Sequence, residues 1–244
     1  MSAAEATRAG RLRDRIALVT GASRGLGAAA AIAFAAEGAH VVLLARTLGG
    51  LEETDDAIRR AGGSATLVEQ DLRELEAIDR LGQALYERWG RLDILLGNAG
   101  DLGLLSPVGH VDQKVWDRVL QVNLTANLRL LRSLDPLLRL SPAGRAIFVT
   151  CEQARQPMAY WASHAASKRA LEALVLCYAD EVERTSVRVN LFEPPAMPTR
   201  LRAQAMPGED ATRLTPPARV AAALLPLAAA ECRQHGQRIV CAPG

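Results

Sequence analysis

The chain has 244 residues, of which 49% are hydrophobic, enough to bury the core of one α/β domain. Its formal charge of only +2 argues against the strongly basic surface that binding to nucleic acid or an anionic membrane requires, so neither partner is expected. No apolar run reaches the length of a membrane span, and residues 1–13 lack the apolar block of a secretion signal. We therefore expect a flexible N-terminal tail over residues 1–13 and a cytoplasmic protein.

The four cysteines are scattered along the chain, at Cys151, Cys177, Cys232 and Cys241. They show neither a disulfide pairing pattern nor the spacing of metal ligands, which favours a reducing compartment and predicts no metal site. No internal repeat or low-complexity linker divides the sequence. A single domain over residues 14–244 is therefore expected.

The first predicted element is a buried strand over Ile16–Val19, which leads into a glycine turn and then a helix rich in alanine. Gly21, Gly25 and Gly27 stand in this turn. Glycine tolerates a left-handed backbone and leaves the N–H groups at a helix start open to a phosphate. The spacing T-G-x-x-x-G-x-G is a variant of the G-x-G-x-x-G dinucleotide fingerprint. An ordinary strand-to-helix turn is the alternative, but the flanking elements favour phosphate binding.

The second predicted strand covers residues 40–45 and is followed directly by Arg46. In a dinucleotide fold the end of this strand faces the adenine ribose, where an acid suits a 2′-hydroxyl and an arginine suits a 2′-phosphate. Arg24 in the glycine turn adds a second cation. Either arginine alone is readily explained as a solvated surface residue, but together they favour NADP(H) over NAD(H).

Strands and helices continue to alternate along the chain. Further strands are predicted at residues 65–69, 92–96, 144–150, 187–191 and 237–241, and helices at 28–37, 47–60, 74–89, 112–140, 160–184 and 216–230. Right-handed crossovers between them give an α/β Rossmann fold, a doubly wound parallel sheet of about seven strands. The helix over 112–140 is expected to be interrupted near Pro136. The proline-rich segment around 194–213 is expected to form a small substrate lid.

Several polar residues fall where predicted strands end, the edge at which an open parallel sheet binds its ligand. Asp71, followed by Leu72, is a candidate adenine contact, and Asn98 of the run Asn98-Ala99-Gly100 is a candidate loop-fixing amide. Both could instead be turn residues. Asn123 lies within a predicted helix, where asparagine is unfavourable, so it either faces solvent or has a specific role.

From about Leu12 to Gly244 the chain resembles the short-chain dehydrogenase/reductase family of standard bacterial length. The resemblance rests on the glycine turn, Asp71, Asn98-Ala99-Gly100, Asn123 and Lys168, in the family's order and close to its spacing. It implies an NADP(H)-dependent oxidoreductase acting on an unidentified carbonyl or alcohol. It also implies a homodimer or homotetramer formed through the two long helices, or a hetero-oligomer with an active relative. The implied cofactor-binding residues are Gly21, Ser23, Arg24, Gly25, Leu26, Gly27, Arg46, Asp71, Leu72, Asn98, Ala99, Gly100, Lys168, Met197 and Thr199.

The sequence departs from the family at the catalytic positions. The family's tyrosine stands four residues before the lysine, where this chain has His164. The family's serine position, thirteen residues earlier, is Cys151; Thr150 is adjacent, but a shift of one residue points a side chain the other way. The implied catalytic set is therefore Asn123, Cys151, His164 and Lys168. The family's Pro-Gly after the sixth strand is also replaced, by Pro194-Pro195, which places a proline ring near the expected nicotinamide.

These replacements predict weakened carbonyl reduction. A histidine beside Lys168 is expected to be neutral, and its ring nitrogen ends short of the position of a phenol oxygen. A 1 Å misplacement costs about 10²-fold in rate. The thiol of Cys151 is also a weak donor to a carbonyl oxygen. Tyr160, one helical turn before His164, is a possible substitute donor, although we expect it to be a packing aromatic.

Two alternatives remain open at the level of sequence. The chain is either a catalytically silent NADP-binding subunit that regulates an active relative, or it carries a reactive thiolate. In the second case His164 and Lys168 would lower the pKa of Cys151. A pKa at or above that of a free thiol, about 8.5, would argue against this alternative.

Overall fold

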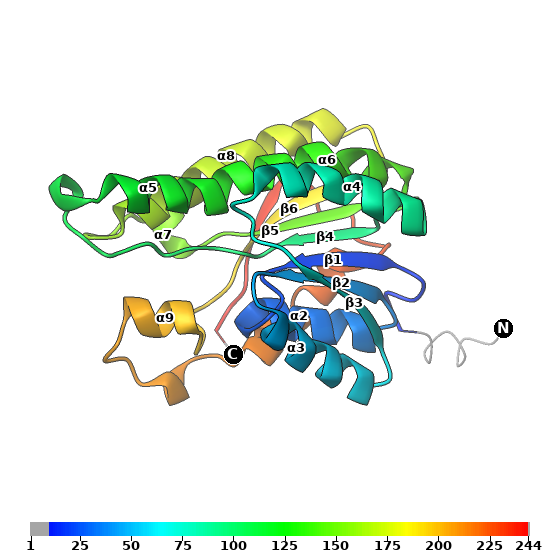
Figure 1. Ribbon diagram of the computed structural model, residues 1–244, viewed down its shortest axis with the longest axis horizontal. Helices are drawn as coiled ribbons and strands as arrows, with labels where there is room; N and C mark the ends of the chain where they lie inside the picture. Colours follow the sequence, from blue (N-terminus) through cyan, green and yellow to red (C-terminus); the bar gives the residue numbers. More distant parts are fainter. Residues whose placement is uncertain (1–9, 244) are drawn as a thin grey trace.

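The computed structural model describes residues 10–243. Its centre is a sheet of seven parallel strands in the order β3-β2-β1-β4-β5-β6-β7 (Figure 1). The strand order reverses between β1 and β4, and such a switch point opens a crevice outside the carboxyl ends of the strands. The predicted doubly wound sheet is therefore confirmed. The strands are β1 Ile16–Thr20, β2 His40–Ala45, β3 Ser64–Glu69, β4 Ile94–Gly97, β5 Arg145–Val149, β6 Arg188–Glu193 and β7 Gln237–Val240.

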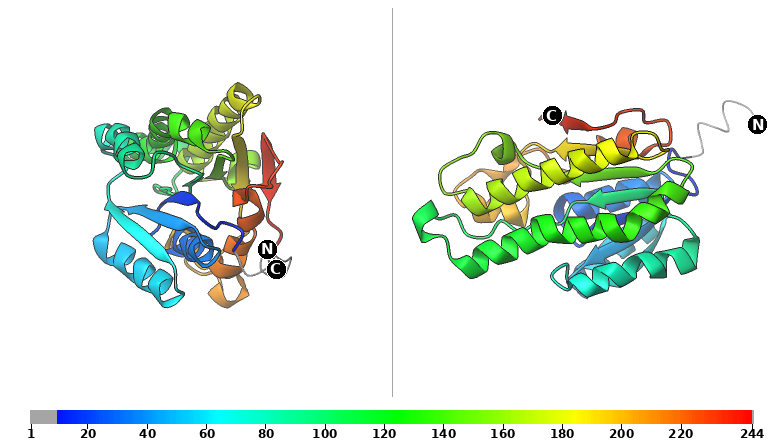
Figure 2. Two further views of the ribbon diagram at one scale, coloured as in Figure 1. Left: turned by 90° about the vertical axis from the view of Figure 1, so that its right-hand side faces the viewer. Right: turned by 90° about the horizontal axis from the view of Figure 1, so that it is seen from above.

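Helices cover both faces of the sheet, as Figures 1 and 2 show. On one face α2, α3, α10 and α11 enclose a core that includes Phe34 and Ile58, both fully buried. On the other face α4, α6 and α8 enclose a second core that includes Leu134 and Leu171. The bounds are α2 Gly25–Ala36, α3 Leu48–Arg60, α4 Leu75–Trp89, α5 Gln113–Leu120, α6 Ala126–Leu140, α7 Glu152–Arg155, α8 Ala162–Val182, α9 Arg200–Ala205, α10 Pro217–Ala222 and α11 Leu225–Ala228.

Small residues let α2 begin directly on the turn after β1. Gly21 has a φ of +66° and Gly25 a φ of +57°, which side chains other than glycine rarely adopt. A Cβ at Gly27 would overlap the carbonyl group of Gly21. The glycine spacing in the sequence is therefore required by the backbone, and the start of α2 is held at the carboxyl end of β1.

The predicted break near Pro136 is wrong, because the break lies earlier. The chain forms α5, then a π-turn, η2, over Gln121–Thr125, and then α6, in which Pro136 is an interior residue. Proline removes one helical hydrogen bond, but Leu134 and Leu138 on either side are fully buried and hold the helix through it. The predicted helix over 216–230 is instead two short helices, and Pro226 lies in the first turn of the second.

The N-terminal boundary of the predicted domain also differs from expectation. Residues 1–9 of the predicted tail lie outside the described residues, but Leu12 is fully buried and its N–H donates to the Glu37 carbonyl at 2.9 Å. The packed chain therefore starts before residue 14.

The proline-rich segment contains α9 and the 3₁₀ turn η3, Ala211–Arg213, while α7 was not predicted. Within residues 10–243 no helix has both the length and the apolar character of a membrane span.

Candidate active site

A cavity of about 570 Å³ lies at the carboxyl ends of β1, β2, β4, β5 and β6. The fold brings most of the predicted site residues together here; only Gly27 and Asn123 do not line the cavity wall. The predicted residues on the wall are Gly21, Ser23, Arg24, Gly25, Leu26, Arg46, Asp71, Leu72, Asn98, Ala99, Gly100, Cys151, His164, Lys168, Met197 and Thr199.

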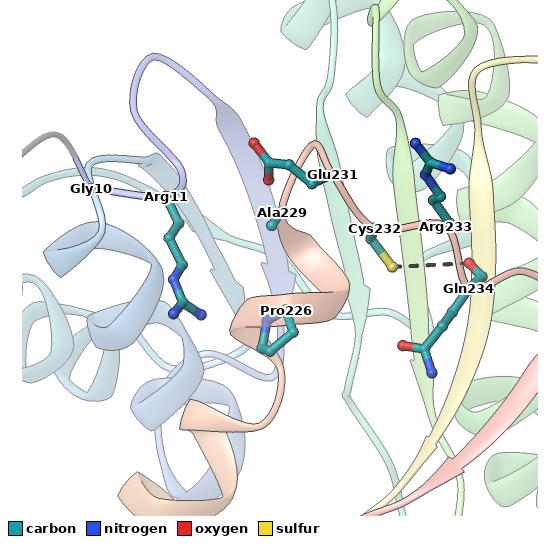
Figure 3. Close-up of a pocket in the computed structure, with 8 residues that line it drawn as sticks. All are labelled: Gly10, Arg11, Pro226, Ala229, Glu231, Cys232, Arg233 and Gln234. Carbon is teal, nitrogen blue, oxygen red and sulfur yellow. Dashed lines mark hydrogen bonds between the residues drawn. The ribbon is translucent and has the colours of Figure 1, made fainter. Parts of the chain in front are cut away.

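A second cavity, of about 630 Å³, is lined by residues that precede β1 and β7 in the chain (Figure 3). It is formed before β1 by Gly10 and Arg11, and before β7 by residues between Pro226 and Gln234. None of the predicted site residues lines it. Of these two cavities in the part of the chain that the structure describes, the first is therefore the candidate site.

Asn98 fixes the two loops that form the floor of the nucleotide half. Its side-chain amide donates to the carbonyl of Thr20 at 2.9 Å, and its backbone N–H donates to the Thr20 hydroxyl, also at 2.9 Å. These bonds join the end of β4 to the glycine turn after β1. The loop-fixing role proposed for this amide is therefore confirmed.

Arg24 and Arg46 stand on the cavity wall at the ends of β1 and β2, and both are exposed. Within residues 10–243 neither guanidinium forms a hydrogen bond or ion pair with a protein group. Two free cations beside a helix start with open backbone N–H groups form a cradle for phosphate groups. This arrangement fits a dinucleotide that carries an additional 2′-phosphate.

Asp71 lies on the cavity wall, but its carboxylate is already engaged. The carboxylate accepts a hydrogen bond from the backbone N–H of Arg73 at 2.9 Å. It also forms an ion pair with the Arg73 guanidinium at 2.6 Å. This is the turn-capping geometry that the sequence left open as an alternative. Asp71 therefore shapes the cavity wall after β3 through its turn.

Asn123 is fully buried in the π-turn and holds the loop that follows β4. Its Oδ1 accepts from the N–H of Asp101 at 2.7 Å, and its Nδ2 donates to the Asp101 carbonyl and to the Ser167 hydroxyl, both at 2.9 Å. Every polar atom of this side chain is used. Of the two roles considered for Asn123, exposure to solvent is wrong and a specific role is correct.

His164 projects from the first turn of α8 and is 4% exposed. Its Nδ1 lies 3.0 Å from the same Asp101 carbonyl oxygen. The ring of Trp161 packs against it edge-on, with 6.0 Å between the ring centres. Burial, reinforced by the charge of Lys168, lowers the pKa of His164 to about 4. The imidazole is therefore neutral at physiological pH, as the sequence predicted.

Lys168 lies one turn further along α8, and its Nζ donates to the carbonyl of Val149 at the end of β5 at 2.8 Å. Burial lowers the pKa of this lysine. Burial also raises the pKa of Cys151, although the positive charge of Lys168 acts in the opposite direction. The thiol is therefore less acidic than a free cysteine, and this site does not favour the reactive thiolate considered from the sequence.

Behind Cys151 lies a charge cluster that sequence reasoning missed. Arg238 of β7 donates to the Cys151 carbonyl at 2.9 Å and forms ion pairs with Glu172 at 2.5 Å and with Glu193 at 2.6 Å. Thr150 also donates to Glu172, at 2.5 Å. The Glu172 and Glu193 side chains belong to residues that are 2% and 5% exposed, respectively. No sequence motif indicates their role. The cluster fixes the chain at the position of the family's serine.

Tyr160 is neither a substitute donor nor a packing aromatic. It is 58% exposed, it does not line the cavity, and its φ of +73° is unusual for a residue with a side chain. Its neighbour Trp161 lines the cavity instead and is 5% exposed. The aromatic residue that packs here is therefore Trp161, one residue after the predicted Tyr160.

The segment predicted to form a lid contributes Leu201 and Gln204 to the cavity wall. Gln204 of α9 donates from Nε2 to the carbonyl of Gly103 at 3.2 Å. Apolar side chains from both sides of this contact form one cluster, which comprises Leu102, Trp161, Ala165 and Ala205, with Leu105, Leu201 and Met206 packed against it. This part of the cavity is therefore partly apolar.

Residues 15–210 match the family described as short chain dehydrogenase. The chain belongs to the short-chain dehydrogenase family. It is 38% identical over 210 residues to the uncharacterized oxidoreductase YciK of Escherichia coli (strain K12), a match that covers 85% of this chain and 83% of the relative.

Solved structures that resemble this chain include two that contain NADPH or NADP. A short chain dehydrogenase of Escherichia coli CFT073, complexed with NADPH, is 37% identical with a TM-score of 0.88, and the match covers 93% of this chain and 96% of that chain. A second, from Shigella flexneri 2a str. 301 and complexed with NADP, is 36% identical with a TM-score of 0.89; 95% of this chain and 98% of that chain are covered.

Asp101 is the main site residue that the sequence analysis of this short-chain dehydrogenase overlooked. Its backbone groups bind Asn123 and His164, and its carboxylate pairs with Arg118 at 2.8 Å. The only available signal was its position directly after Asn98-Ala99-Gly100. Every residue has a backbone carbonyl, so the sequence does not show which one accepts a hydrogen bond. The role of the Asp101 backbone could therefore be found only from the tertiary structure.

Proposed function

We propose that this short-chain dehydrogenase binds NADP(H) and acts on a small-molecule carbonyl or alcohol, with ordinary carbonyl reduction weakened by His164 and Cys151. The observation that carries the cofactor assignment is the pair Arg24 and Arg46 beside the glycine turn, neither of which has a partner among residues 10–243. Crystal structures of relatives with NADPH and NADP support it. When bound, the nicotinamide supplies or accepts hydride. Lys168, Met197 and Thr199 line the half of the cavity that would receive it.

The weakening follows from the groups at the proton-transfer positions. His164 is neutral, and its Nδ1 is occupied by the Asp101 carbonyl, so it offers no acidic hydrogen to a carbonyl oxygen. Cys151 offers a weak thiol donor where a hydroxyl would orient that oxygen. A positioned general acid contributes about 10²- to 10⁴-fold to rate. We expect a loss of this order in carbonyl reduction.

The test restores both groups together as His164→Tyr with Cys151→Ser. NADPH binding is measured first, and NADPH oxidation is then measured with a panel of ketones. We expect both proteins to bind NADPH and the double variant to reduce ketones at least about 10²-fold faster. Equal rates in the two proteins would refute the weakening, and absence of NADPH binding would refute the cofactor assignment. In that case Pro195 blocking the nicotinamide becomes the first explanation to examine.

His164 and Cys151 at the catalytic positions also support a second candidate, a silent NADP-binding subunit, and exposed leucines on the two long helices offer it a surface for association. Leu128 on α6 is 48% exposed and Leu176 on α8 is 43% exposed. Such surfaces suit helix-to-helix association, either with a second copy as a dimer or tetramer or with an active relative. Failure of the double variant to gain activity, together with stable oligomers in sedimentation, would favour this candidate.

A further inference from the structure

The hydrogen bond of His164 fixes which ring nitrogen carries its hydrogen. The Asp101 carbonyl oxygen can only accept, and it already receives Nδ2–H of Asn123 at 2.9 Å. The Nδ1 of His164, 3.0 Å from the same oxygen, must therefore be the second donor. A neutral imidazole has one N–H group. Nε2 is consequently a bare nitrogen with an unshared electron pair.

This bare nitrogen is available to a ligand. His164 lines the cavity, and among residues 10–243 its Nε2 has no hydrogen-bonding partner, yet it is not one of the fully enclosed polar atoms without a partner. The titratable groups that act on the ring are Lys168 on α8 and Asp101 after β4, and Cys151 after β5 lines the same cavity. Burial and the positive charge of Lys168 lower the pKa of His164 to about 4, so Nε2 stays bare near neutral pH.

We infer that the cavity presents Nε2 of His164 as a hydrogen-bond acceptor and therefore selects the hydroxyl group of an alcohol over the carbonyl group of a ketone. This inference rests on the proposed function, because it assumes that the cavity takes an alcohol or carbonyl compound. A hydroxyl places a hydrogen between its oxygen and Nε2. A carbonyl oxygen would face an unshared pair with no hydrogen between them. We expect an alcohol to bind about 10-fold more tightly than a ketone of similar size.

The chain provides an internal control for the hydrogen position. His235 accepts at Nδ1 from the N–H of Val189 at 3.1 Å, and its Nε2 lies 2.9 Å from the Ala179 carbonyl, so its hydrogen must be on Nε2. Long-range ¹H–¹⁵N NMR of histidine-labelled protein distinguishes the two forms, with His164→Asn identifying the signal. At pH 7 we expect His164 with its hydrogen on Nδ1 and His235 with its hydrogen on Nε2. A hydrogen on Nε2 of His164 would overturn the inference.

The second measurement uses probes that cannot turn over. Protein saturated with NADP⁺ is titrated with 2-methyl-2-propanol, which has no hydrogen on its carbinol carbon, and with acetone, which NADP⁺ cannot reduce. We expect the alcohol to shift the Nε2 signal of His164 at about 10-fold lower concentration than acetone. Equal responses, including no shift with either probe, would overturn the inference. Failure to bind NADP⁺ would instead refute the proposed cofactor, and the hydrogen position in the free protein would still be decided.

Discussion

At position 164 a buried imidazole stands where the family places a phenol, and its surroundings set its properties. The ring is 4% exposed, and burial lowers its pKa to about 4. An unfolded histidine titrates near about 6.5. Below that pH the unfolded state therefore takes up a proton that the folded state does not.

This difference predicts a pH-dependent loss of stability. The contribution of His164 is intact above about pH 6.5 and falls as the pH approaches about 4, by at most about 3 kcal/mol. Urea unfolding of the parent and of His164→Asn is compared between pH 7.5 and pH 5. We expect the parent to lose about 2 kcal/mol more than the variant over this range. His110→Asn, at an exposed residue, should follow the parent; equal losses in all three proteins would contradict the prediction.

Our prediction for cofactor choice concerns a single residue. Arg46 follows β2 and has no protein partner within residues 10–243, so its charge is free for a 2′-phosphate. We predict that Arg46→Ala raises the Kd for NADPH about 10- to 100-fold and leaves the Kd for NADH nearly unchanged, as measured by calorimetry. Arg80→Ala, at an exposed arginine on α4, should change neither value. An equal increase in the Kd values for NADPH and NADH would show that Arg46 does not distinguish the 2′-phosphate.

At the level of elements, β7 closes the sheet at one edge and also carries Arg238, which links three other parts of the chain. Arg238 joins it to Glu172 on α8, to Glu193 at the end of β6, and to the chain at Cys151. Removing one partner of a buried ion pair leaves an uncompensated charge. The stability of the sheet edge and the position of Cys151 therefore depend on the same side chain.

A matched pair of variants tests this dependence. Arg238 is 18% exposed, whereas Arg169, which also pairs with Glu172, is 69% exposed. We predict that Arg238→Gln lowers the free energy of unfolding by about 3 kcal/mol, whereas Arg169→Gln lowers it by less than about 1 kcal/mol. Chemical denaturation measures both. Similar losses for the two variants would mean that the ion pairs of Arg238 contribute no more than a surface pair.

For the whole molecule, the cavity exists only because the two halves of the sheet meet. Arg24 and Arg46 come from the first half and Cys151 and His164 from the second, and all four line one cavity at the switch point. A ligand that bridges both halves binds the folded chain and not the unfolded chain. Its binding energy is therefore added to the stability of the whole domain.

We accordingly predict that NADPH at 100 times its Kd raises the free energy of unfolding by about 2.7 kcal/mol. Thermal or urea unfolding with NADPH, and with NADH at the same concentration, measures the effect. The increase with NADH should be much smaller if the two arginines read the phosphate. An unchanged unfolding midpoint with saturating NADPH would contradict binding to the folded domain.

The sequence determined by itself those features that depend on local covalent structure and on apolar periodicity. The apolar runs predicted the strands, and the glycines at 21, 25 and 27 marked the phosphate turn because only glycine fits there. Tertiary structure decided which groups meet across the chain. The position of Asn123 in the π-turn, the contact of His164 Nδ1 with the Asp101 carbonyl and the Arg238 cluster all depend on partners remote in sequence. Backbone carbonyls and burial set these properties, and neither is encoded at any single position.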